Sequence, residues 1–313
     1  MMNENYTTTA STDEQTSAEY MAASFDDLLN HVPTEAQGEY LLSKEEYAAK
    51  KKAERDTVYA LSDNAALTTV GSGEAFRQYL DVQSRFNRFS VTNALLVLAQ
   101  NPNATRLGGF DFWKTQDGFV KTGQTGISIL EPGKEYLRDD GEIGTSYNIK
   151  KVFDISQVNV RKLQRTPQYT EHQILAALVS RYPMAVTGID ELPDGLGAMT
   201  TEDTILVLRG MTFSDTFRAV AYEMVCAELE ADHSASLRTA FHAHAATYML
   251  CAKYGAETTK FRFDKAGALF ADMDARTVKG ELSKIRSAAE NISERMAKYF
   301  STIETSTPTT DEM

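Results

Sequence analysis

One segment of the sequence has the spacing of a zinc-hydrolase motif but lacks the usual metal ligands. In AYEMVCAEL, Glu223 stands where H-E-x-x-H places its general base, and Tyr222 and Cys226 occupy the two histidine positions. Such enzymes need two neutral imidazoles one helical turn apart, so that both face the zinc while the glutamate activates water. A neutral phenol is a poor ligand, whereas a cysteine thiolate is a good one. The motif keeps its base and loses at least one ligand.

A second group of residues combines positive charge with aromatic rings. Its members are Arg85, Arg88, Asn93, Arg106, Phe112, Trp113, Lys114 and Lys121, with Phe110 and Phe119 among them. Cationic side chains neutralise phosphates, and aromatic rings stack on unpaired bases, each stack contributing about 1–3 kcal/mol. The combination predicts a surface for single-stranded nucleic acid, although aromatic residues in a small domain more often belong to its core.

The elements that must position these residues follow from local patterns. Helices are predicted to begin at Ser43, after the Gly-Ser-Gly at 71–73, and after Ser90, which has the character of an N-cap residue. Residues 105–156 then alternate short β-prone runs with glycine-containing turns, which predicts a small antiparallel sheet. We expect FDFW at 110–113 to be one of its strands, and the Glu-Pro-Gly that ends at residue 133 to be a turn.

The remaining sequence predicts a second set of helices and strands, so the fold class is α+β. A helix is expected at 170–181, then one strand, then two strands joined at TTED, and finally helices at about 213–230, 236–254 and 280–300. The apolar stripe of the last helix is expected to pack onto its own domain rather than onto a partner. The predicted parts are a mostly disordered acidic segment at 1–42, domains at 43–165 and 166–301, and a mobile tail at 302–313.

The first of these domains resembles a known family over a long run of residues. The segment RFSVTNALLVLAQNPNATRLGGFDFWKTQDGFVKTGQTGISILEP, with VFDISQ after it, resembles the N-terminal domain of ArdC-type antirestriction proteins of conjugative plasmids and mobile elements. In that family this domain binds single-stranded DNA, and the proteins protect incoming DNA from host defence. One departure concerns the turn at 121–126, where the family is usually rich in Lys and Glu and this chain is not.

The same resemblance implies a zincin-like second domain with a degenerate H-E-x-x-H helix. The family's third ligand aligns approximately with His244, and His242 points about 200° away from it on a helix. A zinc site of Cys226, Glu223 and His244 can be drawn. We favour instead the interpretation that Tyr222 and Cys226 fill a former metal cavity. No cofactor and no active proteolysis are therefore expected, and zinc remains the alternative.

Composition limits the remaining possibilities. The formal net charge is −12, which argues against a protein that coats nucleic acid generally, yet residues 57–166 have more basic than acidic side chains while both flanking segments are acidic. The two cysteines, Cys226 and Cys251, fit a reducing cytoplasmic location, and the polar N-terminal sequence makes secretion unexpected. No apolar run approaches the length that a membrane helix needs.

These observations leave three hypotheses for function. The first is a non-catalytic accessory or anti-defence factor of a mobile genetic element that binds single-stranded DNA through residues 70–160. The second is an acidic inhibitor that binds a host defence nuclease of the restriction or CRISPR type and competes with its DNA. The third is a divergent zinc metallopeptidase. We prefer the first hypothesis. The second follows closely, because the turn at 121–126 has fewer basic side chains than the family pattern.

Overall fold

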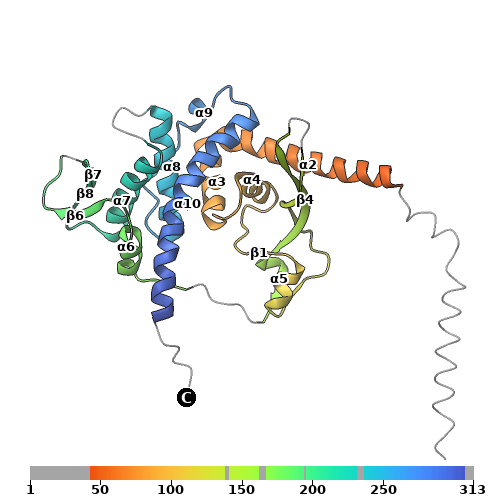
Figure 1. The fold of residues 1–313 in the computed structure, drawn as a ribbon, viewed down its shortest axis with the longest axis horizontal. Helices are drawn as coiled ribbons and strands as arrows, with labels where there is room; N and C mark the ends of the chain where they lie inside the picture. Colours follow the sequence, from red (N-terminus) through yellow and green to blue (C-terminus); the bar gives the residue numbers. More distant parts are fainter. Residues whose placement is uncertain (1–42, 138–140, 162–166, 194, 231–235, 307–313) are drawn as a thin grey trace, which may run out of the picture. The chain divides into compact units, whose positions relative to one another are not determined.

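The computed structural model describes residues 43–137, 141–161, 167–193, 195–230 and 236–306 (Figure 1). The acidic segment 1–42 and the end of the predicted tail lie outside these residues, and so does most of the predicted domain boundary near 165. The chain divides into two compact units, residues 1–54 and residues 55–313, with the division inside helix α2 (Lys44–Val70). The division into domains at 165/166 stays a prediction.

The first helices begin where the sequence predicts them, and each begins with a serine cap. At the start of α2, Glu46 N donates to Ser43 Oγ at 3.1 Å and Ser43 N donates to Glu46 Oε2 at 2.8 Å, which forms a capping box. Ser72 caps α3 (Gly73–Arg85), and Ser90 caps α4 (Val91–Gln100). In both cases the serine hydroxyl accepts a main-chain N–H that the helix itself leaves unpaired.

A three-stranded antiparallel sheet follows these helices, in the order β1-β4-β3. Its strands are β1 (Leu107–Gly108), β3 (Ile127–Leu137) and β4 (Ile143–Asp154). The expected turn at Glu-Pro-Gly is wrong, because this tripeptide lies within β3, where the register shifts between Pro132 and Glu135. Proline has no N–H to donate to a neighbouring strand, and an edge strand with a bulge accommodates it.

The segment FDFW is a second difference from expectation. It forms a short helix, α5 (Phe110–Thr115), and not a strand. The β propensity of its aromatic residues yields to tertiary packing, because the helix places Trp113 in a local core with Phe153 and Val158. The small strand pair β2 (Gly118–Val120) and β5 (Val158–Val160) closes this core from the other side.

The C-terminal half contains a second small sheet among helices, as the sequence predicts. The strands lie in the order β6-β8-β7, with β6 parallel to β8 and β7 antiparallel to it. The elements are α6 (Glu171–Val179), β6 (Ala185–Ile189), β7 (Ala198–Thr200), β8 (Thr204–Leu208), α7 (Phe213–Glu228), α8 (Leu237–Tyr254), α9 (Ala266–Leu269) and α10 (Ala275–Ser306). This combination of helices and small sheets confirms the α+β class.

Helix α10 supplies the longest apolar stripe of the core. Leu282, Ile285, Ala289, Ile292 and Met296 are all buried, so the stripe packs onto its own chain, as expected. The helix continues to Ser306, five residues beyond the predicted domain end at 301. The same core cluster includes buried residues of α3, α4 and β3. None of the helices in the described parts of the chain is long and apolar enough to span a membrane.

Candidate functional site

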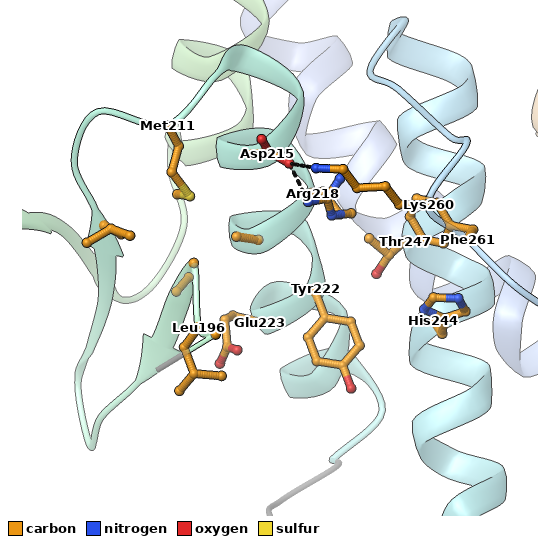
Figure 2. A pocket seen from close by; sticks show the side chains of 15 residues that line it. Leu196, Met211, Asp215, Arg218, Tyr222, Glu223, His244, Thr247, Lys260 and Phe261 are labelled. Carbon is orange, nitrogen blue, oxygen red and sulfur yellow. Dashed lines mark hydrogen bonds and ion pairs between the residues drawn. The ribbon is translucent and has the colours of Figure 1, made fainter. Parts of the chain in front are cut away.

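A pocket of about 620 Å³ lies beside the helix that carries the degenerate motif. Its walls come from the loop before β7, from α7 and α8, and from the segment after α8 (Figure 2). Tyr222, Glu223 and His244 all line it. The sequence therefore identified three residues that the fold brings to one cavity, although Cys226 is not among the lining residues.

Glu223 makes a hydrogen-bonded contact with the neighbouring sheet. Its Oε2 accepts the main-chain N–H of Thr200 at 3.0 Å and the Thr200 hydroxyl at 2.6 Å. Thr200 ends β7, which lies at an edge of the sheet, so this N–H points away from β8. The carboxylate thus satisfies a strand edge that would otherwise be open to solvent.

The residues at the two histidine positions contact each other. The Tyr222 hydroxyl is hydrogen bonded to Cys226, and burial, together with the nearby Cys226 and Glu223, raises the pKa of Tyr222 to about 12. Burial first, and then the charge of Glu223, raises the pKa of the Cys226 thiol to about 11. In the absence of a metal ion, both groups therefore keep their protons near neutral pH.

The two histidines of α8 face different neighbours, in agreement with their angular separation. His244 lines the pocket and packs against the rings of Phe261 and Phe263, at centroid distances of 4.7 and 5.4 Å. His242 is buried instead against α10, where its Nε2 lies 3.2 Å from Glu281 Oε2. Burial lowers the pKa of both imidazoles. Of these two imidazoles, only that of His244 reaches the cavity.

The donor set does not fit a zinc ion. Among the described residues, no three His, Cys, Asp or Glu side chains are grouped so that they could hold a metal. Glu223 is engaged by Thr200, Cys226 does not line the pocket, and His244 Nε2 accepts the main-chain N–H of Arg262 at 3.4 Å. Three protein ligands and an open position are what catalytic zinc requires. We derive no chemical step through a metal at this site.

Two solved structures resemble this fold. The chain is similar to an ArdC antirestriction protein. The metal-free crystal structure of that protein from the R388 plasmid matches with a TM-score of 0.43 and 18% identity, over 67% of this chain and 84% of that chain. The Mn(II)-bound structure of the same protein matches with a TM-score of 0.42 and 17% identity, over 66% and 84% of the two chains. No protein-family model and no curated protein sequence matches this chain.

The aromatic and basic residues predicted to bind nucleic acid divide into buried and exposed groups. Trp113 is fully buried, and its indole Nε1–H donates to Phe153 O at 3.0 Å. An indole with no exposed face cannot stack on a base. Trp113 therefore belongs to the local core and does not itself offer a contact to nucleic acid. The rings that do reach solvent are those of Phe110, Phe112 and Phe119, with 62%, 38% and 65% of their surface exposed.

Asn93 belongs to the structural group. Its side-chain amide donates to Leu130 O at 2.9 Å and accepts from Leu130 N at 2.8 Å. Gln100 makes the same paired contact with Ser128, at 2.9 and 2.8 Å. These two amides of α4 follow the free edge of β3 at every second residue, and they replace the hydrogen bonds of a missing strand. Asn93 therefore anchors a helix to a sheet, and its amide is already occupied.

The cationic residues lie in two separate places along the chain. Arg106, Lys114 and Lys121 accompany the exposed rings, and the Arg106 guanidinium lies 5.8 Å from the centre of the Phe112 ring. Phe119 and Lys121 follow each other at the two-residue spacing of one strand face, and both are exposed. Arg85 and Arg88 are exposed at the end of α3 instead, and Arg85 donates to Pro102 O there.

Asp154 positions this region, and sequence reasoning assigned it no role. It is buried, and its carboxylate accepts from Thr105 N at 2.8 Å, Arg106 N at 3.0 Å, and the Ser156 main chain and hydroxyl at 3.0 and 2.6 Å. Burial raises the pKa of Asp154, but these hydrogen bonds outweigh it and hold the pKa below its ordinary value. The Asp-x-Ser-Gln spacing at 154–157, a capping-box pattern, was the available signal.

Proposed function

We propose that this protein is a non-catalytic accessory or anti-defence factor of a mobile element, and that it binds single-stranded DNA. The contact surface is formed by Arg106, Phe110, Phe112, Lys114, Phe119 and Lys121, which we call the aromatic–basic surface. The observation that carries the proposal is the exposure of three phenylalanine rings beside three cationic side chains on α5, β2 and the adjoining loops.

Large exposed apolar side chains need a reason in a folded protein. Phe110 and Phe119 expose 62% and 65% of their surface, even though Trp113 close by is fully buried. The Phe110 ring contacts that of Phe153 at a centroid distance of 4.7 Å, and most of its surface still faces solvent. Unpaired bases present flat apolar faces that such rings can cover, and nearby lysines neutralise the phosphates between them. Single strands expose the faces of their bases to such rings. In a duplex the base faces are stacked on one another and only the base edges are accessible.

The resemblance in sequence supports the same proposal. The segment from Arg88 to Pro132 resembles the domain that binds single-stranded DNA in ArdC-type proteins, and it contains the whole aromatic–basic surface. The thinned turn at 121–126 retains Lys121, whose Nζ donates to Ser156 O at 2.8 Å. The surface thus has fewer mobile charges than the family pattern implies, and we expect stacking to contribute a larger share of its affinity.

Titration of the full chain with fluorescent oligonucleotides tests this proposal. We expect single-stranded DNA to bind more tightly than duplex DNA and the affinity to fall with added salt. Phe119→Ala should weaken binding about tenfold, as expected for the loss of one stacking contact. Tyr136→Ala is the matched control, because Tyr136 is also an exposed aromatic but lies on β3 outside the surface. Equal affinity for both DNA forms, or equal effects of the two variants, would contradict the proposal.

A second candidate function is inhibition of a host defence nuclease by direct binding. The observation that favours it is the net charge of −12, with acidic segments on both sides of residues 57–166. An acidic surface can occupy the basic groove in which a nuclease holds DNA. Pull-down with purified host nucleases distinguishes the two candidates, since Phe119→Ala should leave an inhibitor fully active and should impair a DNA-binding factor.

The third hypothesis, a zinc metallopeptidase, receives no support from the geometry of the site. Its weak candidate residues were Glu223, Cys226 and His244. Glu223 serves the edge of β7, Cys226 does not line the pocket, and His244 Nε2 already accepts the main-chain N–H of Arg262. We therefore assign no catalytic role to the chain.

A further inference from the structure

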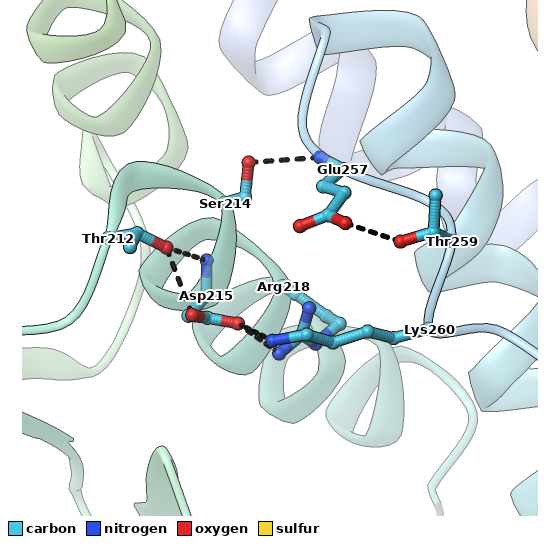
Figure 3. Close-up of polar contacts among 7 residues, drawn as sticks. All are labelled: Thr212, Ser214, Asp215, Arg218, Glu257, Thr259 and Lys260. Atoms are coloured by element: carbon cyan, nitrogen blue, oxygen red, sulfur yellow. Dashed lines mark hydrogen bonds and ion pairs between the residues drawn. The ribbon is translucent and has the colours of Figure 1, made fainter.

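The pocket beside α7 has a basic end that the aromatic–basic surface does not include. Asp215 Oδ1 accepts a hydrogen bond from Lys260 Nζ at 2.8 Å and also pairs with Arg218 (Figure 3). The other carboxylate oxygen, Oδ2, lies 3.0 Å from the Thr212 hydroxyl that donates to it. One carboxylate thus serves two cations and one hydroxyl. Among Asp215, Arg218 and Lys260, two positive charges face one negative charge, and Glu257 beside them accepts from the Thr259 hydroxyl.

The cations at this end have unused hydrogen-bonding capacity. Arg218 Nη1 is buried and has no hydrogen-bond partner within the described residues. Buried polar groups are nearly always hydrogen bonded, so an unpaired guanidinium N–H indicates a missing acceptor. Lys260 is 55% exposed, and only one of its three N–H groups is needed by Asp215. Lys260 is therefore accessible to an anion, whereas Arg218 Nη1, which is closed to solvent, reaches one only after its side chain shifts.

The other acidic side chain of the pocket does not meet this need. Glu223 is bound to Thr200, and it lies away from the group formed by Asp215, Arg218 and Lys260 (Figure 2). The remaining polar side chains near it, Tyr222 and His244, are uncharged near neutral pH, since burial raises the pKa of the first and lowers that of the second. The pocket therefore has one charged, donor-rich end.

The walls beyond the basic end are mostly apolar. They include Leu196, Leu208, Met211, Ala219 and Phe261. The loop before β7 is fitted closely to α7, because a Cβ on Gly197 would lie 3.0 Å from Ala219 Cβ and 3.1 Å from Met211 Sδ. A pocket with an apolar body and a few convergent polar groups at one end is the usual form of a small-molecule site.

We propose that this pocket binds a small organic anion, with a carboxylate or phosphate group held by Arg218 and Lys260 and an apolar body lying against Leu196, Met211 and Phe261. The two cations already hold the carboxylate of Asp215 in this geometry, and a shift of the Arg218 side chain on binding gives its unpaired Nη1 the ligand as an acceptor. The site is independent of the proposed DNA contact, since the two share no residue.

Calorimetric titration of the full chain with three matched probes tests the proposal. Hexanoate and hexyl phosphate carry the two anionic groups on the same apolar chain, and hexanol lacks the charge. We expect at least one anion to bind about tenfold or more tightly than hexanol, and the stronger of the two identifies the ligand class. Lys260→Gln should weaken that binding about tenfold. Lys298→Gln, which removes an exposed lysine of α10, should leave it unchanged.

The outcomes that overturn the proposal are specific. Hexanol binding as tightly as both anions would remove the role of the charged end, and an anion affinity that Lys260→Gln does not change would place the site elsewhere. Absence of binding by either anion up to about 10 mM would also overturn it. Anion affinity of Arg218→Gln tests the same contact from the second cation. If that variant does not fold, the Lys260→Gln measurement still decides the outcome, because Lys260 is exposed. Loss of DNA binding has no bearing on these results.

Discussion

Thr200 donates both its main-chain N–H and its hydroxyl to the same oxygen of Glu223, at 3.0 and 2.6 Å. This contact joins the edge strand β7 to helix α7 at the residue where an H-E-x-x-H enzyme would have its general base. The glutamate of the degenerate motif is thus explained by the packing of a helix on a sheet.

Removal of the Glu223 carboxylate should therefore cost stability. We expect Glu223→Ala to lower the free energy of unfolding by about 1–3 kcal/mol, because it leaves a partly buried N–H without its acceptor. Urea denaturation measures this change. Thr200→Val serves as a partner variant, and the double variant should lose less than the sum of the two single losses. A catalytic glutamate with no structural role would instead leave stability unchanged or higher.

The thiols of the native protein should react slowly. Burial raises the pKa of Cys226 to about 11 and that of Cys251 to about 12, and the thiolate is the reactive form. We expect both cysteines to react with a disulfide reagent at about pH 8 far more slowly than they do after unfolding in guanidinium. The protein should also purify with the same zinc content as Cys226→Ala. Rapid labelling of Cys226, or zinc lost on its replacement, would contradict this assignment.

Stability should fall in mild acid through His242. Burial lowers its pKa from 6.5, so the unfolded chain binds a proton more readily than the folded protein does. The stabilisation is complete above about pH 6.5 and is lost progressively as the pH falls below that value and through the lower folded-state pKa. His242→Asn should reduce the difference in unfolding free energy between about pH 7.5 and pH 5.5. His244, whose pKa burial also lowers, accounts for part of the remainder.

The buried Trp113 should affect folding more than DNA binding. Trp113→Phe removes the indole N–H that donates to Phe153 O, and we expect a loss of about 1–2 kcal/mol in unfolding free energy. Affinity for single-stranded DNA, measured under conditions where the variant is folded, should change less than threefold. A loss of DNA affinity as large as that caused by Phe119→Ala would contradict this assignment and would indicate that Trp113 contacts DNA.

Helix starts were predictable because their signals are local. Ser43 and Ser90 stand at the caps that the sequence indicates, where one hydroxyl meets one nearby N–H. The helix expected after residues 71–73 begins with a cap at Ser72. The conformation of FDFW was not predictable in this way. Its aromatic residues favour a strand, but burial of Trp113 against Phe153 requires a helical turn, and the contact connects residues forty positions apart.

The candidate site was predictable in its location but not in its chemistry. The spacing of Tyr222, Glu223 and His244 placed three residues at one pocket. Nothing in the spacing could indicate that Thr200 would bind Glu223, or that Lys260, from the segment after α8, would join Arg218 at the carboxylate of Asp215. Those contacts depend on how the loops are folded, and a periodic pattern contains no such information.

The paired amide contacts of Asn93 and Gln100 with β3 bear on a different property, which is how the protein behaves at high concentration. An uncovered strand edge is a template on which another chain can add. In this protein, α4 occupies the edge from Ser128 to Leu130 with the same donor and acceptor pattern that an incoming strand would use. In a variant without both amides, the edge of β3 from Ser128 to Leu130 would be uncovered. Strands of other copies could then pair with this edge and build fibres.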